Sequence, residues 1–317
     1  MENNNNQKYP FRGIVLEGGG SAGTGHVGAL EILENEDILG ELTHFVGSSA
    51  GAIMASALAC RASVDYMKYN LNTDFTTFLD SSCFCKDIHR FFTKHGYFKG
   101  DSLEKWVGDY LKVLTDSAEI TFQQAYERFG TFLEITVTDF TLGEPLYLSH
   151  LNFPDMMIKS AVRRSAMIPL VFAAVREKHL TNVLVDDEIV TKNITRVFVD
   201  GGLLDNYPMH RLDKYLSPEQ VIGIRLMTSK KIYEMNNPGL LKYKAPTKIV
   251  DFIRILYTIM RDKALMCHLN DKDWQRTIRV DVGPISSTDF NLTQTEKNFL
   301  VDQGKTGALE FLEQYRI

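Results

Sequence analysis

Short apolar runs alternate with helix-like stretches along most of this chain, and this alternation constrains its fold more than any other feature. Such alternation favours a mainly parallel sheet covered by helices on both faces. Strands are predicted at residues 13–17, 43–46, 131–138, 144–148, 197–199, 221–226 and 278–280. Helices are predicted at residues 25–34, 50–60, 103–114, 155–165, 247–268 and 294–314, the third of them capped by Asp101 or Ser102.

The chain is expected to form a single domain. Its 317 residues contain no repeat, no low-complexity linker and no break in composition. We therefore predict a disordered polar tail over residues 1–9, which contains four consecutive asparagines, and one domain over residues 10–317.

Composition and charge exclude several classes of protein. A formal charge of -5 argues against nucleic acid as a partner, because phosphate binding needs a basic surface. The polar start lacks a secretory signal, and no run reaches the roughly 18 apolar residues of a membrane span, so a cytoplasmic chain with at most peripheral membrane association is expected. The four cysteines show no zinc-ligand spacing, and free thiols are predicted at Cys60, Cys83, Cys85 and Cys267.

The segment Gly47-Ser48-Ser49-Ala50-Gly51 fits the G-x-S-x-G pattern of a nucleophile elbow. It lies between a predicted strand and a predicted helix, which is where an exposed nucleophilic serine is held in such folds. The helix would also direct its free N–H groups toward a developing oxyanion. The alternative is an ordinary helix-opening turn, with Ser48 or Ser49 as its cap.

A glycine-rich loop, Gly18-Gly19-Gly20-Ser21-Ala22-Gly23, joins the first strand to the first helix. Successive glycines let backbone N–H groups converge on an anion, which suits an oxyanion hole. The spacing Gly18-x-Gly20-x-x-Gly23 also fits a dinucleotide-binding loop. That function requires a carboxylate at the end of the second strand, and the sequence there is Val46-Gly47-Ser48-Ser49.

A serine nucleophile needs a base, and Asp200-Gly201-Gly202 is the strongest candidate in the sequence. It ends a buried apolar strand, so the Asp200 carboxylate is expected at the sheet edge where Ser49 lies. None of the eight histidines has a context that singles it out. The alternative is a structural Asp-Gly turn.

These three motifs, in this order, resemble the patatin-like phospholipase family. Further similarities are His26-Val27-Gly28, Thr138-Asp139, Ser165-Ala166-Met167-Ile168-Pro169 and Asp205-Asn206-Tyr207-Pro208. The resemblance implies a three-layer α/β/α fold and a Ser49–Asp200 dyad without a catalytic histidine. It also implies an oxyanion hole formed by Gly18, Gly19 and Gly20, an elbow supported by Gly47 and Gly51, and acyl-ester hydrolysis with no metal or cofactor.

Two features depart from that family. The family often has Arg or Lys two places after the third glycine, where this chain has Ala22. Residues 176–196, which include Asp186-Asp187-Glu188, are long and polar and predict a surface excursion, which would suit a lid.

Two apolar groups are candidates for lipid contact. The helix at 247–266 is apolar with interspersed Lys and Arg, which suits a membrane interface, an acyl pocket or plain core packing. An aromatic cluster would line an acyl channel or pack in the core: Phe75, Phe78, Phe84, Phe91, Phe92, Tyr97 and Phe98.

The sequence thus predicts a calcium-independent phospholipase A or lysophospholipase that acts on membrane phospholipid or another lipid ester through an acyl–Ser49 intermediate. Two alternatives remain open: a general esterase or triacylglycerol lipase using the same site, and a catalytically silent lipid- or nucleotide-binding module. Whether a partner protein activates the enzyme is left open by the sequence.

Overall fold

A mixed eight-stranded sheet forms the centre of the protein, for which a computed structural model describes residues 9–185, 188–228, 233–234, 237, 239 and 245–315. The strand order is β10-β9-β1-β2-β4-β8-β7, with β5 also paired to β4. The strands are β1 Gly13–Leu16, β2 His44–Ser48, β4 Phe132–Asp139, β5 Glu144–Ser149, β7 Val175–Val185, β8 Glu188–Asp200, β9 Val221–Met227 and β10 Thr277–Asp281. The five strands from β10 to β4 are parallel, as the sequence predicted.

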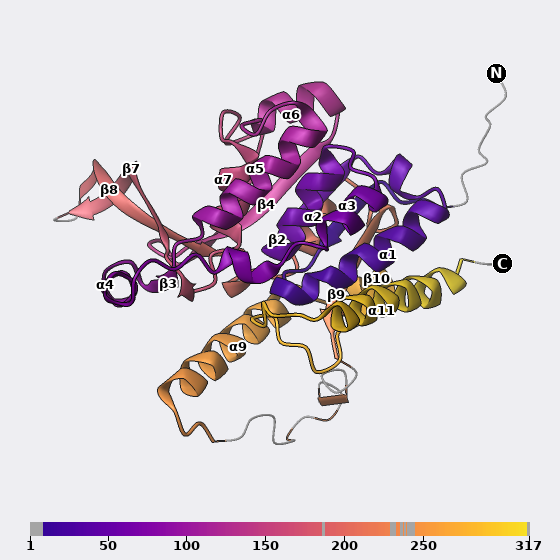
Figure 1. Cartoon of the computed structure of the whole chain (residues 1–317). Helices are drawn as coiled ribbons and strands as arrows, with labels where there is room; N and C mark the ends of the chain where they lie inside the picture. The colour runs from indigo at the N-terminus through magenta and orange to yellow at the C-terminus, as the bar shows by residue number, and fades with distance from the viewer. Residues whose placement is uncertain are drawn as a thin grey trace.

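Helices cover both faces of this sheet and complete the three-layer α/β/α arrangement (Figure 1). One face packs against α1, α2, α7 and α11, whose bounds are Thr24–Asn35, Ala50–Ala59, Ile158–Ser165 and Gln294–Glu313. The other face packs against η5 (Met209–Lys214) and the end of α9 (Ile249–His268). Successive strand residues serve the two layers, because Ile14 and Leu16 lie in the first core and Val15 lies in the second.

The carboxyl ends of β2 and β8 meet on the same edge of β4. Ser48 of β2 pairs with Thr136, and Asp200 of β8 pairs with the next residue, Val137. β5 occupies the opposite edge of β4 over the same residues. Strand β8 therefore runs toward β2 from the opposite direction, antiparallel to β4, and the two strand ends face each other.

The polar stretch at 176–196, predicted as a surface excursion, is an antiparallel hairpin made of β7 and β8. It projects from one end of the molecule, beside α4 (Phe84–Lys94) (Figure 1). Asp186 and Asp187 lie outside the described residues, and a lid function for the hairpin stays a prediction. A small second sheet pairs β3 (Gly96–Phe98) with β6 (Leu170–Phe172).

Two local expectations are wrong. Tyr9, assigned to the polar tail, is buried: its ring stacks on Phe11, and its hydroxyl donates to Glu36 (2.9 Å). Residues 1–8 lie outside the described part of the chain. The helix α5 (Asp101–Thr115) is not capped by its own side chains, because Asp80 accepts hydrogen bonds from the N–H groups of residues 99, 100 and 102.

The remaining helices and turns are short. They are α3 Val64–Asn70, η3 Phe75–Phe78, α6 Phe122–Phe129 and α10 Asp271–Gln275, together with the short turns η1 Gly20–Gly23, η2 Leu39–Glu41, η4 Gly201–Leu203 and η6 Pro218–Gln220. The cysteines Cys60, Cys83 and Cys85 are free thiols, as predicted, whereas the Cys267 side chain lies outside the described residues.

Candidate active site

Ser49 lies at a sharp turn between β2 and α2, where it has the backbone angles φ 51° and ψ -120°. A non-glycine residue adopts a positive φ only when its surroundings hold it there. The turn is tight because Gly47 and Gly51 allow close backbone packing. A Cβ added to Gly47 would lie 2.3 Å from the carbonyl oxygen of Gly51, and a Cβ added to Gly51 would lie 2.0 Å from the carbonyl oxygen of Leu16. This is the strand–turn–helix geometry of a nucleophile elbow.

Ser49 and Asp200 are in direct contact. The Oγ of Ser49 donates a 2.6 Å hydrogen bond to Oδ2 of Asp200, and both residues are buried. The other oxygen of the carboxylate, Oδ1, accepts from the N–H of Gly202 at 2.7 Å. The carboxylate is thus fixed in position and has one oxygen directed at the serine hydroxyl.

The surroundings of Asp200 make its carboxylate more basic than an exposed one. Burial raises the pKa of the Asp200 carboxyl from 3.8 to about 6, while the hydrogen bonds from Ser49 and Gly202 and the charge of Arg261 act in the opposite direction. A carboxylate with a pKa near 6 is ionised at neutral pH and is a stronger base than an ordinary aspartate.

The glycine loop lies against Ser49, since a Cβ added to Gly18 would be 3.1 Å from the Cβ of the serine. The N–H of Gly18 already donates to the carbonyl oxygen of Asn206 (3.0 Å), so in this structure it is not free to bind an oxyanion. The N–H groups of Gly19 and Gly20 have no acceptor among the described residues. Two of the three predicted donors are therefore available.

Asn206 joins the glycine loop to the segment that follows Asp200, a connection that sequence reasoning did not assign. Its Nδ2 donates to the carbonyl oxygen of Gly18 (2.9 Å) and to Glu17 (3.2 Å). Its Oδ1 lies so close to Gly18 and Gly202 that a Cβ on either would clash with it. The only sequence signal was its place in Asp205-Asn206-Tyr207-Pro208.

Ser165, the last residue of α7, holds the elbow in place. Its Oγ accepts the N–H of Ser49 (2.8 Å) and donates to the carbonyl oxygen of Thr136 (2.6 Å). Ser165 is fully buried, so the strained turn is tied to β4 through one side chain. In the sequence, this serine was noted only as part of Ser165-Ala166-Met167-Ile168-Pro169.

Comparison with known proteins matches this chain to one family. The family model described as patatin-like phospholipase matches residues 14–213, which include all three motifs. The chain belongs to the patatin-like phospholipase family. The three motifs of this patatin-like chain therefore lie within the part of the sequence that the family model matches.

Relatives with similar sequences come from viruses, bacteria and fungi. The uncharacterized mimivirus protein R571 is 28% identical, covering 96% of this chain and 95% of its own length, and Bacillus subtilis YqhO is 27% identical, covering 95% and 98%. Triacylglycerol lipase 4 of Saccharomyces cerevisiae is 30% identical over 67% of this chain, which corresponds to 24% of the lipase.

Two solved structures share the fold. VipD from Legionella pneumophila superposes with a TM-score of 0.61 at 18% identity, covering 96% of this chain and 67% of VipD. The type III effector ExoU gives 0.52 at 15% identity, covering 97% and 54%.

This patatin-like chain differs from the common family pattern at Ala22, and the structure gives the reason. Ala22 is buried against Val282 and Leu300, so a long cationic side chain does not fit there. A cation approaches the site from α9 instead. The charge of Arg261 acts to lower the pKa of the Asp200 carboxyl, against the larger effect of burial, which raises it.

His26 has a structural position in this family member. It is fully buried, and its Nδ1 is hydrogen-bonded to the carbonyl oxygen of Gly23 (2.9 Å). Burial lowers the pKa of its imidazole to about 4, so the ring is neutral at neutral pH. Among the side chains described, no histidine is hydrogen-bonded to Ser49 or Asp200.

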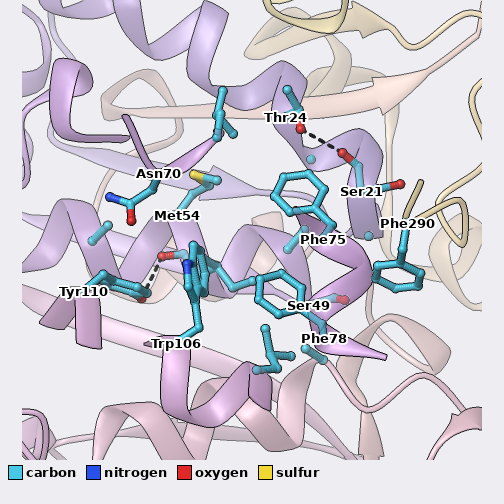
Figure 2. A pocket seen from close by; sticks show the side chains of 18 of the residues that line it. Ser21, Thr24, Ser49, Met54, Asn70, Phe75, Phe78, Trp106, Tyr110 and Phe290 are labelled. Carbon is cyan, nitrogen blue, oxygen red and sulfur yellow. Dashed lines mark hydrogen bonds between the residues drawn. The ribbon is translucent and has the colours of Figure 1, made fainter. Parts of the chain in front are cut away.

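A pocket of about 910 Å³, including its open mouth, extends from Ser49 along α2 (Figure 2). One face of α2 forms a wall, with Ala50, Ile53, Met54 and Ala57 at helical spacing. In Figure 2, Ser49 lies near Phe78 and Phe290 at one end, and Asn70 and Tyr110 lie at the other. The rest of the lining is mostly aromatic or aliphatic: Tyr66, Met67, Leu71, Phe75, Leu103, Trp106, Ala166, Ile168 and Phe172, with Gly20, Ser21, Gly23 and Thr24 near the glycine loop.

The polar groups at the far end of this pocket are hydrogen-bonded to the protein itself. Asn70 donates to the carbonyl oxygen of Tyr66 (2.8 Å), and the Trp106 indole donates to Thr73 (3.2 Å). The Tyr110 hydroxyl is bonded to Ser56. The space they enclose is therefore suited to an apolar group, and no described carboxylate lines it as a nucleotide ribose would require.

The predicted lipid-contact groups divide between core and surface. Of the aromatic cluster, Phe75 and Phe78 line the pocket, whereas Phe84 and Phe92 are exposed. Helix α9 packs Leu265 into the core and exposes Phe252, although several of its side chains, including those of residues 249–251, 253–254 and 266–268, lie outside the description. Within the described residues, no helix has the length and apolar character needed to cross a bilayer.

Proposed function

We propose that this chain is a serine acyl hydrolase of phospholipase A or lysophospholipase type, with Ser49 as nucleophile and Asp200 as base. The observation that supports it most is the 2.6 Å hydrogen bond from Ser49 to Asp200 at the entrance of an apolar pocket. Membership of a family of lipid hydrolases supports the same assignment.

In the proposed reaction, Oδ2 of Asp200 takes the hydroxyl proton of Ser49 as Oγ attacks the ester carbonyl carbon. The carbonyl oxygen becomes an oxyanion, which the N–H groups of Gly19 and Gly20 stabilise together with the amino end of α2. Collapse of this intermediate breaks the ester bond, and the leaving alcohol takes the proton from Asp200. Water then attacks the acyl–Ser49 ester and gives a proton to Asp200. Collapse of this second intermediate breaks the bond between the acyl carbon and Oγ, Oγ of Ser49 takes the proton back from Asp200, and the fatty acid leaves.

The acyl chain is proposed to occupy the pocket along α2. Its walls are apolar, and the polar groups at its far end are already hydrogen-bonded. Burying an alkyl chain there is favourable by about 0.8 kcal/mol per methylene group. A nucleotide would leave its phosphates and ribose without partners in such a space, which disfavours the nucleotide-binding alternative.

A triacylglycerol lipase or general esterase is a second candidate, favoured by the yeast relatives named triacylglycerol lipases 4 and 5. The two candidates differ in whether a charged headgroup is accepted. A panel of phospholipids, lysophospholipids, triacylglycerols and simple esters of matched chain length separates them.

Two further assignments remain proposals. We propose that the chain from Tyr9 onward acts as one domain, because Tyr9 packs in the core and the strands of one sheet extend along the chain from β1 to β10. We also propose that the hydrolase meets its lipid by peripheral contact with a membrane surface.

The direct test of the proposed function is the variant Ser49→Ala. It is expected to release no fatty acid from phospholipid vesicles or from soluble esters, while its circular dichroism spectrum matches that of the wild type. Retained hydrolysis would remove Ser49 from the role of nucleophile.

A further inference from the structure

Helix α4 has an inverted pattern of burial. Its charged residues Asp87 and Arg90 are only 2% and 9% exposed, whereas Phe84, Ile88 and Phe92 are 70%, 38% and 73% exposed. These three apolar residues recur every four positions and therefore lie along one face of the helix. In most soluble proteins, charged side chains are exposed and large apolar ones are buried. A continuous strip of exposed apolar side chains marks a site of contact with another molecule or with a membrane.

The buried polar face fixes α4 in this orientation. Asp87 accepts the N–H of Ser82 at 2.8 Å and forms an ion pair with Arg90 at 2.9 Å. Arg90 also donates to Ser82 Oγ (2.9 Å) and to the carbonyl oxygen of Tyr97 (2.5 Å). Rotating the helix to bury its phenylalanines would break this network and expose a buried ion pair, so the apolar face stays outside.

Exposed apolar side chains also occur on the β7–β8 hairpin, which projects at the same end of the molecule as α4 (Figure 1). Leu180 of β7 and Ile189 of β8 are 77% and 75% exposed. The N–H of Ala174, just before β7, donates to the carbonyl oxygen of Lys94 at the end of α4 (3.1 Å), which ties the two elements together.

Both ends of α4 lead directly to the pocket that holds Ser49. Before the helix, η3 supplies Phe75 and Phe78 to the pocket wall. After it, β3 pairs with β6, and the ring of Phe98 lies 6.1 Å from that of Phe172, another wall residue. A surface that receives α4 would therefore lie close to the wall of the pocket that holds the serine.

The charges on α4 indicate what kind of surface this is. With Asp87 and Arg90 paired and buried, the exposed charged side chains of the helix are Lys86 and Lys94, both cationic. Exposed phenylalanines combined with lysines are typical of helices that lie in the interface of an anionic bilayer. At 11 residues, α4 is too short to span a membrane and suits a position parallel to it.

We propose that α4 forms a membrane-docking surface, with Phe84, Ile88 and Phe92 entering the interfacial region of an anionic lipid bilayer. This inference rests on the proposed lipid hydrolase function and specifies how the active site reaches its substrate. The docking surface holds the pocket close to the lipid, so an acyl chain enters without crossing water.

The test compares the full-length wild type with the variant Phe84→Gln/Ile88→Gln/Phe92→Gln. Three properties are measured: sedimentation with phosphatidylcholine–phosphatidylserine vesicles, release of fatty acid from those vesicles, and hydrolysis of a short water-soluble ester. We expect vesicle binding and vesicle hydrolysis to fall by about tenfold or more, with soluble-ester hydrolysis unchanged. The matched control is Tyr69→Gln/Val113→Gln/Leu309→Gln, which removes exposed apolar side chains from α3, α5 and α11 and is expected to behave as the wild type.

The outcomes separate the docking proposal from the proposed function. Full vesicle binding by the triple α4 variant overturns the docking surface, whatever the activity. Ser49→Ala should bind vesicles like the wild type, and if it still hydrolyses soluble ester, the assigned nucleophile is wrong while docking stands. Wild-type protein that ignores vesicles but dimerises through α4 would assign this face to a second copy and overturn the proposal.

A milder variant covers the case in which the triple variant also loses soluble-ester activity. Lys86→Gln/Lys94→Gln leaves the helix and its apolar residues intact. It is expected to weaken binding to anionic vesicles several-fold and to leave binding to neutral phosphatidylcholine vesicles unchanged. Equal binding of this variant and the wild type to anionic vesicles would contradict the proposed docking of α4.

Discussion

The Oγ of Ser49 lies 2.6 Å from Oδ2 of Asp200, and the two residues reach this position along one edge of β4 from opposite directions. Ser49 follows the last residue of β2, and Asp200 is the last residue of β8. The distance between them therefore depends on the pairing register of both strands with β4. A shift of either strand by one residue would separate the hydroxyl from the carboxylate.

The raised pKa of Asp200 predicts how activity depends on pH. Only the ionised carboxylate can accept the Ser49 proton, so kcat/KM on a soluble ester should fall as the pH drops below about 6 and level off above it. A profile with its acid limb near pH 4 would contradict the buried environment described for this carboxylate.

The same raised pKa predicts that the ionised carboxylate of Asp200 lowers the free energy of unfolding. Burial favours the protonated form of Asp200. The contribution of this residue to folding stability is therefore fully present below the unfolded pKa of 3.8 and is lost as the pH rises through about 6. This difference corresponds to about 3 kcal/mol. Asp200→Asn should therefore abolish activity yet be more stable than the wild type at pH 8 by up to that amount, and equally stable at pH 3.

Urea unfolding at the two pH values measures this effect. The exposed Asp302→Asn serves as control and should change stability little at either pH. Loss of stability at pH 8 in the Asp200→Asn protein would show that the ionised carboxylate stabilises the fold, contrary to this account.

Arg261, which lies on α9, is expected to lower the pKa of Asp200 against the larger effect of burial. Removing its charge with Arg261→Gln should raise the pKa of Asp200 and move the acid limb of the pH–rate profile to higher pH. Lys263→Gln, on the exposed side of the same helix, is the control. Identical profiles for Arg261→Gln and the wild type would mean that the guanidinium does not act on Asp200.

Ser165 should matter for catalysis although it touches no reacting atom. Ser165→Ala leaves the buried N–H of Ser49 and the Thr136 carbonyl without this partner, which predicts a loss of about 1–3 kcal/mol in unfolding free energy and a lower kcat with little change in KM. Ser160→Ala, in the same helix but bonded to Glu104 near the surface, is the comparison. Wild-type kcat in the Ser165→Ala variant would rule out a positioning role.

The length of the pocket predicts selectivity for the acyl chain. Ala57 lies two turns beyond Ser49 on α2, at about 12 Å along the helix, and lines the pocket. Ala57→Leu should fill this part of the pocket and lower turnover of long-chain esters more than that of short-chain esters. The ratio of kcat/KM for the two chain lengths is the readout, and an unchanged ratio would place the acyl chain elsewhere.

The parts of the fold and site that sequence predicted are those fixed by local signals. β1, β2, α2 and the glycine loop depend on apolar runs and on glycines that permit close backbone contact, and these are visible in the sequence. The direction of β8 was missed, because its first ten residues mix Ile and Val with charged and polar residues on both faces, and none of them is buried. The periodicity that places Asp200 at a strand end does not specify which way that strand runs.

Other features depend on partners distant in sequence. Asp80 caps α5 from about 20 residues away, and Asn206 binds a loop 188 residues earlier. The inverted burial of α4 is also hidden, because its spacing of phenylalanines is that of an ordinary core helix. Only the ion pair of Asp87 and Arg90, buried beneath it, shows which face is turned outward.

The activation of Ser49 by Asp200 is tested most directly by labelling with a fluorophosphonate that reacts with activated serines, followed by mass spectrometry of the adduct. We expect a single adduct on Ser49 in the wild type, no adduct in Ser49→Ala, and strongly reduced labelling in Asp200→Asn. An adduct on another serine, or equal labelling of wild type and Ser49→Ala, would contradict this expectation.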